Sequence, residues 1–390
     1  MNKVGIIGDV HLGASIKAGQ KDTETGIPSR LLDYKDTLMY AISYVAKQCK
    51  TVIFTGDIFE HRFPHMVQQQ IFSECLFQAT SLGIEKIYIL IGNHDQQRTS
   101  STTTLAYLSE LKLENIIVIE DPTTIDMDGH KIHFLPYRDR KYFGVTDYDM
   151  AIEKTDEICK ELSKNNGTKS NVMIGHMAIE GTFFSEEEAE LYTDNELMMK
   201  KVSFLPFDLT VMGHVHTPAL ISQNPVIYYV GSLEKRGAFE SHEKQLMIVD
   251  LDSKETEYHS LPCRKFFEYK FAIPKSGVDF QKILFETLAI YSKEDKVKDN
   301  IVKCEITMKS DDIGHYNPEN VRQFFLDKGC SFAFPPKISV ESDRVIRSTL
   351  IETSSDTDTW TKHISANVTD PELRANLIQI GSEIIAEVES

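Results

Sequence analysis

The fold of this chain is decided first by residues 4–11, which read Val-Gly-Ile-Ile-Gly-Asp-Val-His. The short apolar run predicts a buried strand, and the second glycine allows the sharp turn that ends it. Asp9 and His11 follow two positions apart, so in an extended segment both side chains lie on one side while Val10 faces away. The chain therefore opens with a strand, a glycine and two side chains able to bind a metal.

The same pattern recurs four times along the chain. The later islands are Gly56-Asp57, Gly92-Asn93-His94-Asp95, Gly175-His176 and Gly213-His214-Val215-His216, each directly after an apolar run. Functional groups in an α/β sheet gather beyond the carboxyl ends of parallel strands, so we expect the five islands to converge on one crevice. One such island alone is more often turn chemistry, but five in series predict a single site.

The residue types of the islands predict two metal ions. The ligand-type side chains of the islands are carboxylates, a carboxamide and imidazoles. A set without thiolate favours manganese, iron, magnesium or zinc. Seven ligands are too many for one ion but suit two that share a carboxylate. Two ions roughly 3.5–4 Å apart stabilise the attacking and leaving oxygens of a phosphoryl displacement, so the pattern predicts hydrolysis of phosphate esters.

Three regions are expected along the chain. Over residues 1–262, apolar strands alternate with helical patterns such as 34–49 and 66–82, which predicts a layered α/β sandwich whose strands are covered by helices or by a second sheet. Residues 263–340 predict a small α+β domain with strands at 265–273, 302–308 and 337–340 and helices at 279–291 and 318–328. Residues 341–390 predict a linker and a helical segment with Asp370 as its N-cap and Pro371 as its first helical residue.

The bulk properties limit the setting of the chain. Its 390 residues carry a formal net charge of −17, which opposes a generally basic nucleic-acid-binding surface but says little about one face. Residues 341–390 hold ten acidic and four basic side chains, and 186–188 are three glutamates; both predict solvated surface. Six scattered cysteines favour a reducing, cytoplasmic setting. No apolar run predicts a membrane span or a signal peptide.

Taken together, the islands resemble the signature of the calcineurin-like metallophosphoesterase superfamily over about the first 230 residues. Within it, Gly56-Asp57-Ile58-Phe59 and residues 229–233 resemble the SbcD-type DNA double-strand-break repair nucleases, and the tailed-phage recombination endonuclease subunits most of all. Two departures stand out. Glu60, followed by His61, occupies a position where relatives often carry histidine, and Gly-Ser-Leu at 231–233 replaces Gly-Ser-Pro. They leave the roles of Glu60 and His61 and the shape of that loop open.

The resemblance implies a role for each island residue. One ion would be held by Asp9, His11 and His216, the other by Asn93, His176 and His214, with Asp57 bridging both. His94 would bind the scissile phosphate and protonate the leaving oxygen, for which its ring must be substantially cationic. Asp95 either orients that ring or caps the turn. Two divalent cations are the implied cofactors, with manganese preferred and magnesium as the other option.

The resemblance also implies partners. Basic residues near the islands predict a rim for DNA phosphates on an otherwise acidic protein, namely Arg62, Arg98, Arg138, Arg140, Lys235 and Arg236, with Lys17, Lys21 and Lys141. Residues 263–340 would form a capping domain that contacts DNA. An SMC-like ATPase of the SbcC type would bind a C-terminal apolar stripe of Leu373, Leu377, Ile380, Ile384 and Val388, unless that stripe docks on its own protein. The helix at 66–82 would form a homodimer, or serve core packing alone.

The predicted function is a manganese-dependent DNA exonuclease and endonuclease that acts with an ATPase in end processing, recombination and repair. The alternative is a phosphomonoesterase or cyclic-nucleotide phosphodiesterase on the same metal core, because a fold does not fix a substrate. A DNA-end-binding scaffold with an inactive site is a third interpretation, which the complete ligand set disfavours. Digestion polarity, end preference and ATP dependence stay open.

Overall fold

The computed structural model describes residues 2–96, 102–182, 197–238, 240–273, 279–292, 294–341, 356–368 and 371–389. The chain divides into two compact units, the first comprising Met1–Tyr269, Ser292–Cys304 and Glu319–Pro335, and the second Lys270–Tyr291, Glu305–Pro318 and Pro336–Ser390. The predicted boundaries at 262 and 340 remain a prediction. Within the described ranges, no helix has the length and apolar character needed to cross a lipid bilayer.

The first of two large sheets has six strands in the order β14-β13-β1-β2-β3-β4. The strands are β1 (Lys3–Ile7), β2 (Thr51–Phe54), β3 (Lys86–Leu90), β4 (Ile116–Ile119), β13 (Gln245–Asp250) and β14 (Thr256–Ser260). β1, β2, β3 and β4 pair in parallel, whereas β13 and β14 join in antiparallel. Four parallel strands thus end at one edge of this sheet.

The second large sheet also has six strands, in the order β11-β12-β10-β7-β6-β5. The strands are β5 (Thr123–Met127), β6 (His130–Leu135), β7 (Asn171–His176), β10 (Leu209–Gly213), β11 (Ala219–Gln223) and β12 (Val226–Tyr229). The four central strands are parallel and the two edge strands antiparallel. Parallel central strands again place several carboxyl ends side by side.

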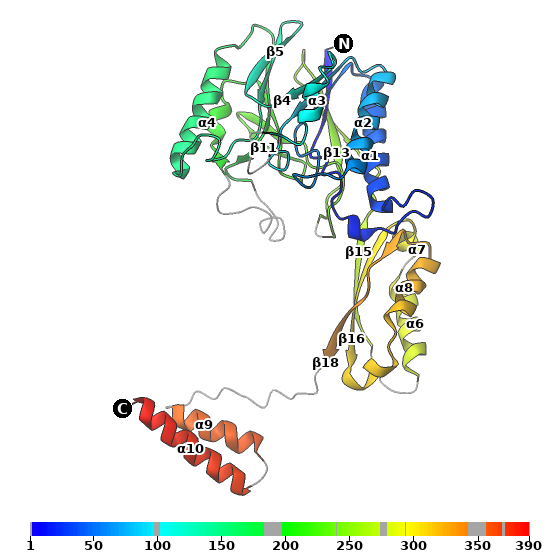
Figure 1. Ribbon diagram of the computed structural model, residues 1–390, viewed down its shortest axis with the longest axis vertical. Coiled ribbons are helices and arrows are strands. Elements are labelled where there is room, and N and C mark those ends of the chain that lie inside the picture. Colours follow the sequence, from blue (N-terminus) through cyan, green and yellow to red (C-terminus); the bar gives the residue numbers. More distant parts are fainter. Residues whose placement is uncertain are drawn as a thin grey trace. The chain divides into compact units, whose positions relative to one another are not determined.

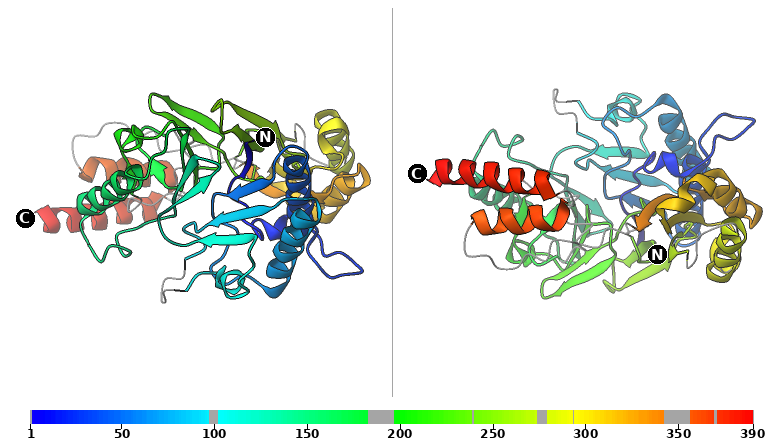
Figure 2. Two further views of the ribbon diagram at one scale, coloured as in Figure 1. Left: turned by 90° about the horizontal axis from the view of Figure 1, so that it is seen from above. Right: turned by 90° about the horizontal axis from the view of Figure 1, so that it is seen from below.

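The two sheets pack face to face and helices cover their outer faces (Figures 1 and 2). A buried cluster joins Ile6 and Ile53 of the first sheet to Phe134 and Val211 of the second. The outer face of the first sheet is covered by α1 (Ser29–Ala46) and α2 (Met66–Ser81), and that of the second by α4 (Tyr148–Ser163). The predicted layered α/β sandwich is confirmed, and each sheet has helices on one face and the other sheet on its second face.

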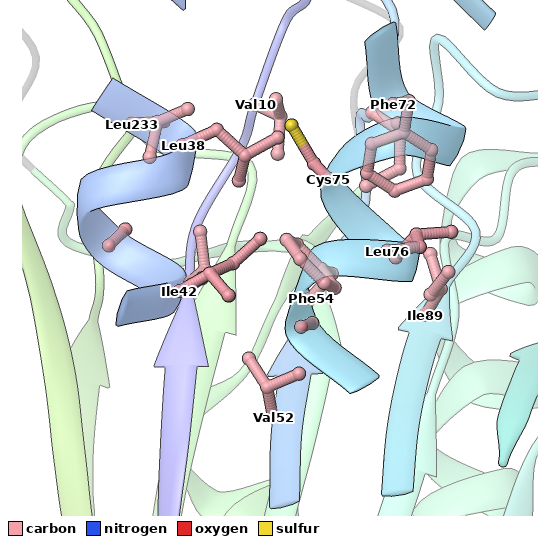
Figure 3. Close-up of a cluster of buried hydrophobic side chains, with 14 of the residues drawn as sticks. Val10, Leu38, Ile42, Val52, Phe54, Phe72, Cys75, Leu76, Ile89 and Leu233 are labelled. Atoms are coloured by element: carbon pink, nitrogen blue, oxygen red, sulfur yellow. The ribbon is translucent and has the colours of Figure 1, made fainter. Parts of the chain in front are cut away.

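The packing of α1 and α2 follows from their sequences. Residues three and four positions apart in α1 form one apolar face, which includes Leu38 and Ile42. Figure 3 shows Ile42 of α1 and Leu76 of α2 directed at Phe54 and Ile89 of the strands beneath. Because these strands are held from both faces, the loops at their carboxyl ends start from fixed points.

Smaller elements connect the layers of the sandwich. They are η1 (Ile16–Ala18), α3 (Ala106–Glu110), β8 (Ala178–Ile179), β9 (Met198–Met199) and η2 (Lys201–Phe204). β8 and β9 form a short parallel pair. The sequence patterns did not predict β4, β5, β6, β11, β13, β14, α3 or α4 as separate elements.

The chain after residue 262 contains the five elements expected there and three that were not predicted. The expected ones are β15 (Phe266–Ala272), α6 (Phe280–Tyr291), β16 (Ile301–Lys309), α8 (Pro318–Asp327) and β18 (Lys337–Glu341), and the others are α7 (Glu294–Val297), η3 (Ser310–His315) and β17 (Phe332–Ala333). β16 pairs in parallel with β17 near its start and with β18 near its end. Alternate residues of β16 are buried, so one face of this strand carries the apolar side chains.

Two helices close the chain, α9 (Asp356–Asn367) and α10 (Pro371–Glu389), and they lie side by side in both views of Figure 2. The indole of Trp360 donates a hydrogen bond to the carbonyl of Leu377 at 2.9 Å, against the surface left open by Gly381. The expected helix after Pro371 is present, while its predicted cap Asp370 lies outside the described residues. The first half of this hairpin, α9, was not predicted.

Candidate metal centre

The five islands follow strands whose carboxyl ends neighbour one another. Asp9 and His11 follow β1, Asp57 follows β2 and Asn93 follows β3, and these three strands are adjacent and parallel. In the second sheet, the end of β7 pairs with the end of β10, so His176 lies opposite Gly213. Face-to-face packing of the sheets then brings both groups into one buried crevice.

Three of the predicted ligands form the first trio, Asp9, His11 and His216. The Nε2 atoms of His11 and His216 are 3.0 Å apart, and Asp9 Oδ2 lies 3.9 Å from His216 Nε2. One donor atom from each member lies within 4.8 Å of the others, and all three residues are buried. Such convergence of imidazole nitrogens and a carboxylate is what one cation site requires.

Three others form the second trio, Asn93, His176 and His214. Asn93 Oδ1 lies 3.1 Å from His176 Nε2 and 3.1 Å from His214 Nδ1. Asp57 stands between the trios, with Oδ2 at 3.6 Å from His11 Nε2 and 3.5 Å from His176 Nε2. The tertiary structure thus brings all seven predicted ligands together, with Asp57 positioned to serve both trios.

The backbone of this crevice leaves no room for larger residues. A Cβ atom on Gly92 would lie 2.1 Å from Asp57 Oδ1, and one on Gly213 would lie 2.6 Å from Asp9 Oδ1. Three ligands adopt the left-handed region, with φ of 47° for His11, 50° for Asp57 and 86° for His214. Such conformations persist where the surrounding structure enforces them, and they are concentrated at functional sites.

The residues present fit a pair of divalent ions. If two ligand atoms each lie about 2.1 Å from one ion and form a right angle at that ion, they are about 3.0 Å apart. The Nε2 atoms of His11 and His216 are separated by this distance, 3.0 Å. Burial lowers the pKa of His11 to about 3, aided by the charge of Arg236, so this imidazole is neutral and has a lone pair to donate.

The field of the crevice favours positive charge. Burial lowers the pKa of His176, but the carboxylates of Asp57 and Asp9 outweigh it and raise this pKa to about 9. Burial likewise raises the pKa of Asp57, yet the imidazoles of His176, His94 and His11 hold it well below its ordinary value. A site that keeps its carboxylate ionised and stabilises a cation on the neighbouring ring is suited to divalent metal ions.

His94 lies at the edge of the centre and is half-buried. Its backbone N–H donates to Asp57 Oδ1 at 2.8 Å, and its Nδ1 lies 2.6 Å from the carbonyl oxygen of Glu60. Because a carbonyl only accepts, Nδ1 carries the proton, and Nε2 is the nitrogen left to meet a substrate. The ring is T-shaped to His11 at 4.9 Å between centroids.

Asp95 is buried and its carboxylate accepts from backbone groups of the surrounding loops. The N–H of Gly92 donates to Oδ2 at 3.0 Å and the N–H of Ile58 to Oδ1 at 3.2 Å. Of the two roles expected from the sequence, these contacts are those of a turn cap. The contact that orients the His94 ring comes from the Glu60 backbone.

Two carboxylates behind the first trio were not recognised from the sequence as part of the site. Glu60 Oε2 lies 2.9 Å from His11 Nδ1, and Glu240 Oε1 lies 3.1 Å from His216 Nδ1. In the sequence, Glu60 stands out only as a departure from a familiar pattern, and its role and that of His61 were left open. Nothing in the sequence signals Glu240, because no motif surrounds it and its partner is 24 positions away.

The predicted basic residues are largely engaged within the protein. Arg138 is buried, with its guanidinium donating to the carbonyls of Tyr137 and Glu120 and to Asp121, and Lys235 is buried with Nζ 2.6 Å from the carbonyl of Glu240. These contacts disfavour DNA binding by Arg138 and Lys235. Both were included in the predicted rim because a sequence does not show which side chains are exposed.

The other basic residues differ in their surroundings. The half-buried Arg62 donates to the carbonyls of Gln96 and Asn93, so it supports the loop that carries a ligand. Arg236 pairs with Glu60 at 2.7 Å, and Arg140 donates to the carbonyl of Thr146. Arg98 lies outside the described residues, as do the glutamates at 186–188.

A family model described as calcineurin-like phosphoesterase matches residues 2–218, which is more than half of the chain and includes all five islands. The chain belongs to this family. Membership of the calcineurin-like phosphoesterases confirms the predicted family and fold, and it implies divalent metal ions at the centre described above.

This calcineurin-like phosphoesterase is similar in sequence to several named proteins. It is 26% identical over 223 residues to the D component of the nuclease SbcCD of Staphylococcus epidermidis, covering 54% of this chain and 57% of that protein. The protein of the same name from Staphylococcus saprophyticus is 23% identical, and the match covers 56% of this chain and 59% of that protein. The match thus spans less than two thirds of these two proteins. "Exonuclease subunit 1" of Enterobacteria phage T4 is 25% identical over 313 residues, with 78% and 80% covered.

Among solved structures, a dimetal phosphatase from Danio rerio aligns with 66% of this chain at 9% identity and a TM-score of 0.37.

Proposed function

We propose that this calcineurin-like phosphoesterase is a metal-dependent nuclease that hydrolyses phosphodiester bonds in DNA. The observation that carries the proposal is the convergence of two trios of ligands on the shared carboxylate of Asp57. Relatives that bear nuclease names, one of them matched over 80% of its length, support DNA as the substrate class. End processing in recombination and repair is the proposed context, in a cytoplasmic setting.

The proposed roles follow the geometry of the centre. The first trio would hold one ion, the second trio would hold the other, and Asp57 would be a ligand of both. Bound ions of this kind would supply an activated water as nucleophile and neutralise charge on the phosphoryl oxygens. His94 holds its ring with Nδ1–H on the carbonyl of Glu60, so Nε2 would carry the second proton of the cationic ring and give that proton to the leaving oxygen. Asp95 supports His94 through the turn that it caps.

Manganese is the proposed ion, with magnesium as the other option. Four imidazoles, two carboxylates and one carboxamide make a mixed nitrogen and oxygen set. Magnesium prefers oxygen ligands, whereas imidazole suits transition metals better. A nitrogen-rich centre therefore favours manganese over magnesium.

DNA contact is proposed for the basic residues that stay close to the centre and are not buried. Arg62 and Arg236, which bond the loops that carry Asn93 and Glu60, meet this condition, in contrast to Arg138 and Lys235; the half-buried Arg140 is proposed with them. Lys17 and Lys21, in the segment that follows His11, expose their side chains. Because phosphate contacts release counterions, binding through these residues weakens as salt rises, and an affinity insensitive to ionic strength would remove them from the proposal.

An SMC-like ATPase of the SbcC type is the proposed partner, bound through α10. Leu373, Ile380 and Ile384 are 52%, 53% and 56% exposed, so the predicted stripe does not turn wholly onto α9. Leu377 is half-buried, and the side chain of Val388 lies outside what is described. Exposed apolar residues at helical spacing fit the groove of a partner helix pair. Relatives named as one component of SbcCD support this partner.

A homodimer through α2 is proposed on the same grounds. Met66 and Phe77 on this helix are 86% and 74% exposed, and Phe63 just before it is 74% exposed. Large apolar side chains gathered on one element mark an interaction surface rather than core packing. The inward face of α2, with Phe72 and Leu76, is already used by the core.

The deciding experiment incubates the purified chain with linear double-stranded DNA, with a phosphomonoester and with a cyclic nucleotide, each with manganese, magnesium or chelator. We expect manganese-dependent cleavage of DNA and a large loss in Asp57→Ala with DNA binding retained. Turnover confined to the phosphomonoester or the cyclic nucleotide would replace the nuclease by the alternative function. Undiminished cleavage by Asp57→Ala would overturn the assigned centre.

A further inference from the structure

The loop that follows β6 lies at the same edge of the second sheet as the metal ligands of that sheet. β6 ends at Leu135 and pairs in parallel with β7, which ends at the ligand His176. The ring centroid of Tyr137, just beyond β6, lies 6.2 Å from that of His176 and 6.0 Å from that of His214. Because the carboxyl ends of parallel strands share one edge, residues 136–143 border the metal centre.

This loop combines aromatic and basic side chains. Residues 137–143 read Tyr-Arg-Asp-Arg-Lys-Tyr-Phe. Sites that bind a nucleic-acid strand combine positive charge, which follows the phosphates, with aromatic rings on which bases stack. Arg140 is half-buried and Lys141 is exposed, whereas Arg138 is buried. The loop therefore places both kinds of group beside the metal centre.

Tyr142 is an exposed aromatic residue of this loop, and several contacts hold its ring. The ring centroid lies 3.9 Å from the guanidinium carbon of Arg138, which is a cation–π distance. The hydroxyl of Tyr142 donates to Asp121 Oδ1 at 3.3 Å, and its backbone N–H donates to Asp139 Oδ1 at 2.8 Å. The ring of Phe143 packs against it edge to face, with 5.0 Å between centroids. Tyr142 nevertheless remains 48% exposed.

The guanidinium of Arg138 that supports this ring is itself fixed. It donates to the carbonyls of Tyr137 and Glu120, both at 2.9 Å, and to Asp121 at 3.2 Å. The ion pair also offsets the negative charge of Asp121, which would otherwise repel a phosphate. Because the ring of Tyr142 is already held in place, it loses little side-chain freedom when it stacks on a ligand, and more of the stacking energy appears as affinity.

We propose that the ring of Tyr142, supported by Arg138, stacks on a nucleobase of the DNA strand that is bound at the metal centre. The inference rests on the proposed function, and it names a substrate contact of that same site. Interior bases of a duplex are already stacked on both sides, so the base that meets Tyr142 is a terminal or an unpaired one.

The chain limits how far this base lies from the cleaved bond. Tyr137, beside the ligands, and Tyr142 are five positions apart in the sequence. Their Cα atoms are therefore separated by at most about 18 Å. A strand with the duplex rise of about 3.4 Å per nucleotide covers this distance in about five nucleotides, so the stacked base lies within about that number of the cleaved bond.

The experiment measures KM and kcat of the full chain with Mn²⁺ on a labelled single-stranded oligonucleotide. Loss of one base–aromatic stack weakens binding about 5- to 100-fold, so we expect Tyr142→Ala to raise KM by such a factor and to keep kcat. Tyr142→Phe, which retains the ring, should stay close to the wild-type KM. Tyr40→Ala is the matched control, because this tyrosine of α1 is 42% exposed and its hydroxyl lies 3.0 Å from His259 Nε2.

Two further substrates separate stacking from other roles of Tyr142. Hydrolysis of bis(p-nitrophenyl) phosphate, which has no nucleobase, should be unchanged in every variant. A series of oligonucleotides then carries one abasic residue at successive positions near the cleaved bond. At one position the abasic residue should raise KM for the wild type but not for Tyr142→Ala, because a contact that is already lost cannot be lost again.

An unchanged KM in Tyr142→Ala, an equal loss on the small diester, or abasic effects that are the same in both proteins at every position would overturn the inference. Thermal unfolding of each variant checks that the fold is kept, and Tyr142→Leu serves if Tyr142→Ala does not fold. A wild type that hydrolyses the small diester but cleaves none of the oligonucleotides would instead overturn the proposed function.

Discussion

Gly92→Ala is expected to disrupt the metal centre without removing any ligand. No positive φ is imposed at Gly92, so alanine is acceptable to the backbone itself. Its Cβ, however, would lie 2.1 Å from Asp57 Oδ1 and 2.4 Å from Asp57 N, whereas real Cβ atoms keep about 3.0 Å from their neighbours. The bridging carboxylate or the glycine loop must therefore move by about 0.9 Å.

The size of this movement sets the expected effect. Metal–ligand distances hold within about 0.2 Å, so a displacement several times larger takes Asp57 out of bonding range of at least one ion. We expect Mn²⁺ affinity to fall by more than the roughly 10- to 100-fold caused by losing an outer partner. Overpacking should also lower the free energy of unfolding of the metal-free protein by about 1–3 kcal/mol.

Calorimetric Mn²⁺ titration and chemical unfolding of the metal-free chain measure the two effects. Gly314→Ala is the matched control, because a Cβ there would have nothing within 4 Å and no positive φ is imposed. If Gly92→Ala bound two ions with wild-type affinity, the close approach of Gly92 to Asp57 would have no functional meaning. The assignment of Asp57 as the bridging ligand would then lose its main steric support.

Three further predictions concern metal, pH and the C-terminal hairpin. Mn²⁺ at 100 times its dissociation constant should stabilise the fold by about 2.7 kcal/mol per site, and chelator should abolish the gain in a thermal melt; equal melting with and without metal would contradict a folded-state site. Burial lowers the pKa of His133 to about 4 in the folded protein, whereas the unfolded pKa is near 6.5. The contribution of His133 to the free energy of unfolding is therefore fully present above pH 6.5, and it falls by at most about 3 kcal/mol as the pH is lowered to about 4. In His133→Gln the unfolding free energy should depend less on pH in this window, and an unchanged slope would refute it. Trp360→Ala should lower the free energy of unfolding by less than the roughly 3–5 kcal/mol of a fully buried tryptophan. Because short isolated helices are marginally stable, the backbone amides of α9 and α10 should nevertheless exchange their hydrogens faster in this variant. Unchanged protection from exchange would show that Trp360 does not hold the two helices together.

The chemistry of the centre could be predicted from the sequence because each ligand is tied to a local pattern. A strand, a glycine and a ligand within a few residues is a local arrangement, and the parallel sheet rule then places the ligands at one edge. Asp57 and Asn93 needed no long-range information beyond this rule, whereas the 3.5 Å approach of Asp57 to His176 also required the two sheets to pack face to face. β13 and α9, which were not predicted, contribute no ligand, so the prediction of the centre did not depend on them.

The tertiary structure alone decided what surrounds the ligands. Glu60 and Arg236 are 176 positions apart in the chain, and their pairing depends on how two loops from different strands meet. The exposure of Arg138 depended in the same way on packing, and burial removed it from the expected basic rim. A sequence records which side chains follow a strand, since that depends on neighbouring residues. It does not record which charges meet behind those side chains, because that depends on the packing of every layer of the sandwich.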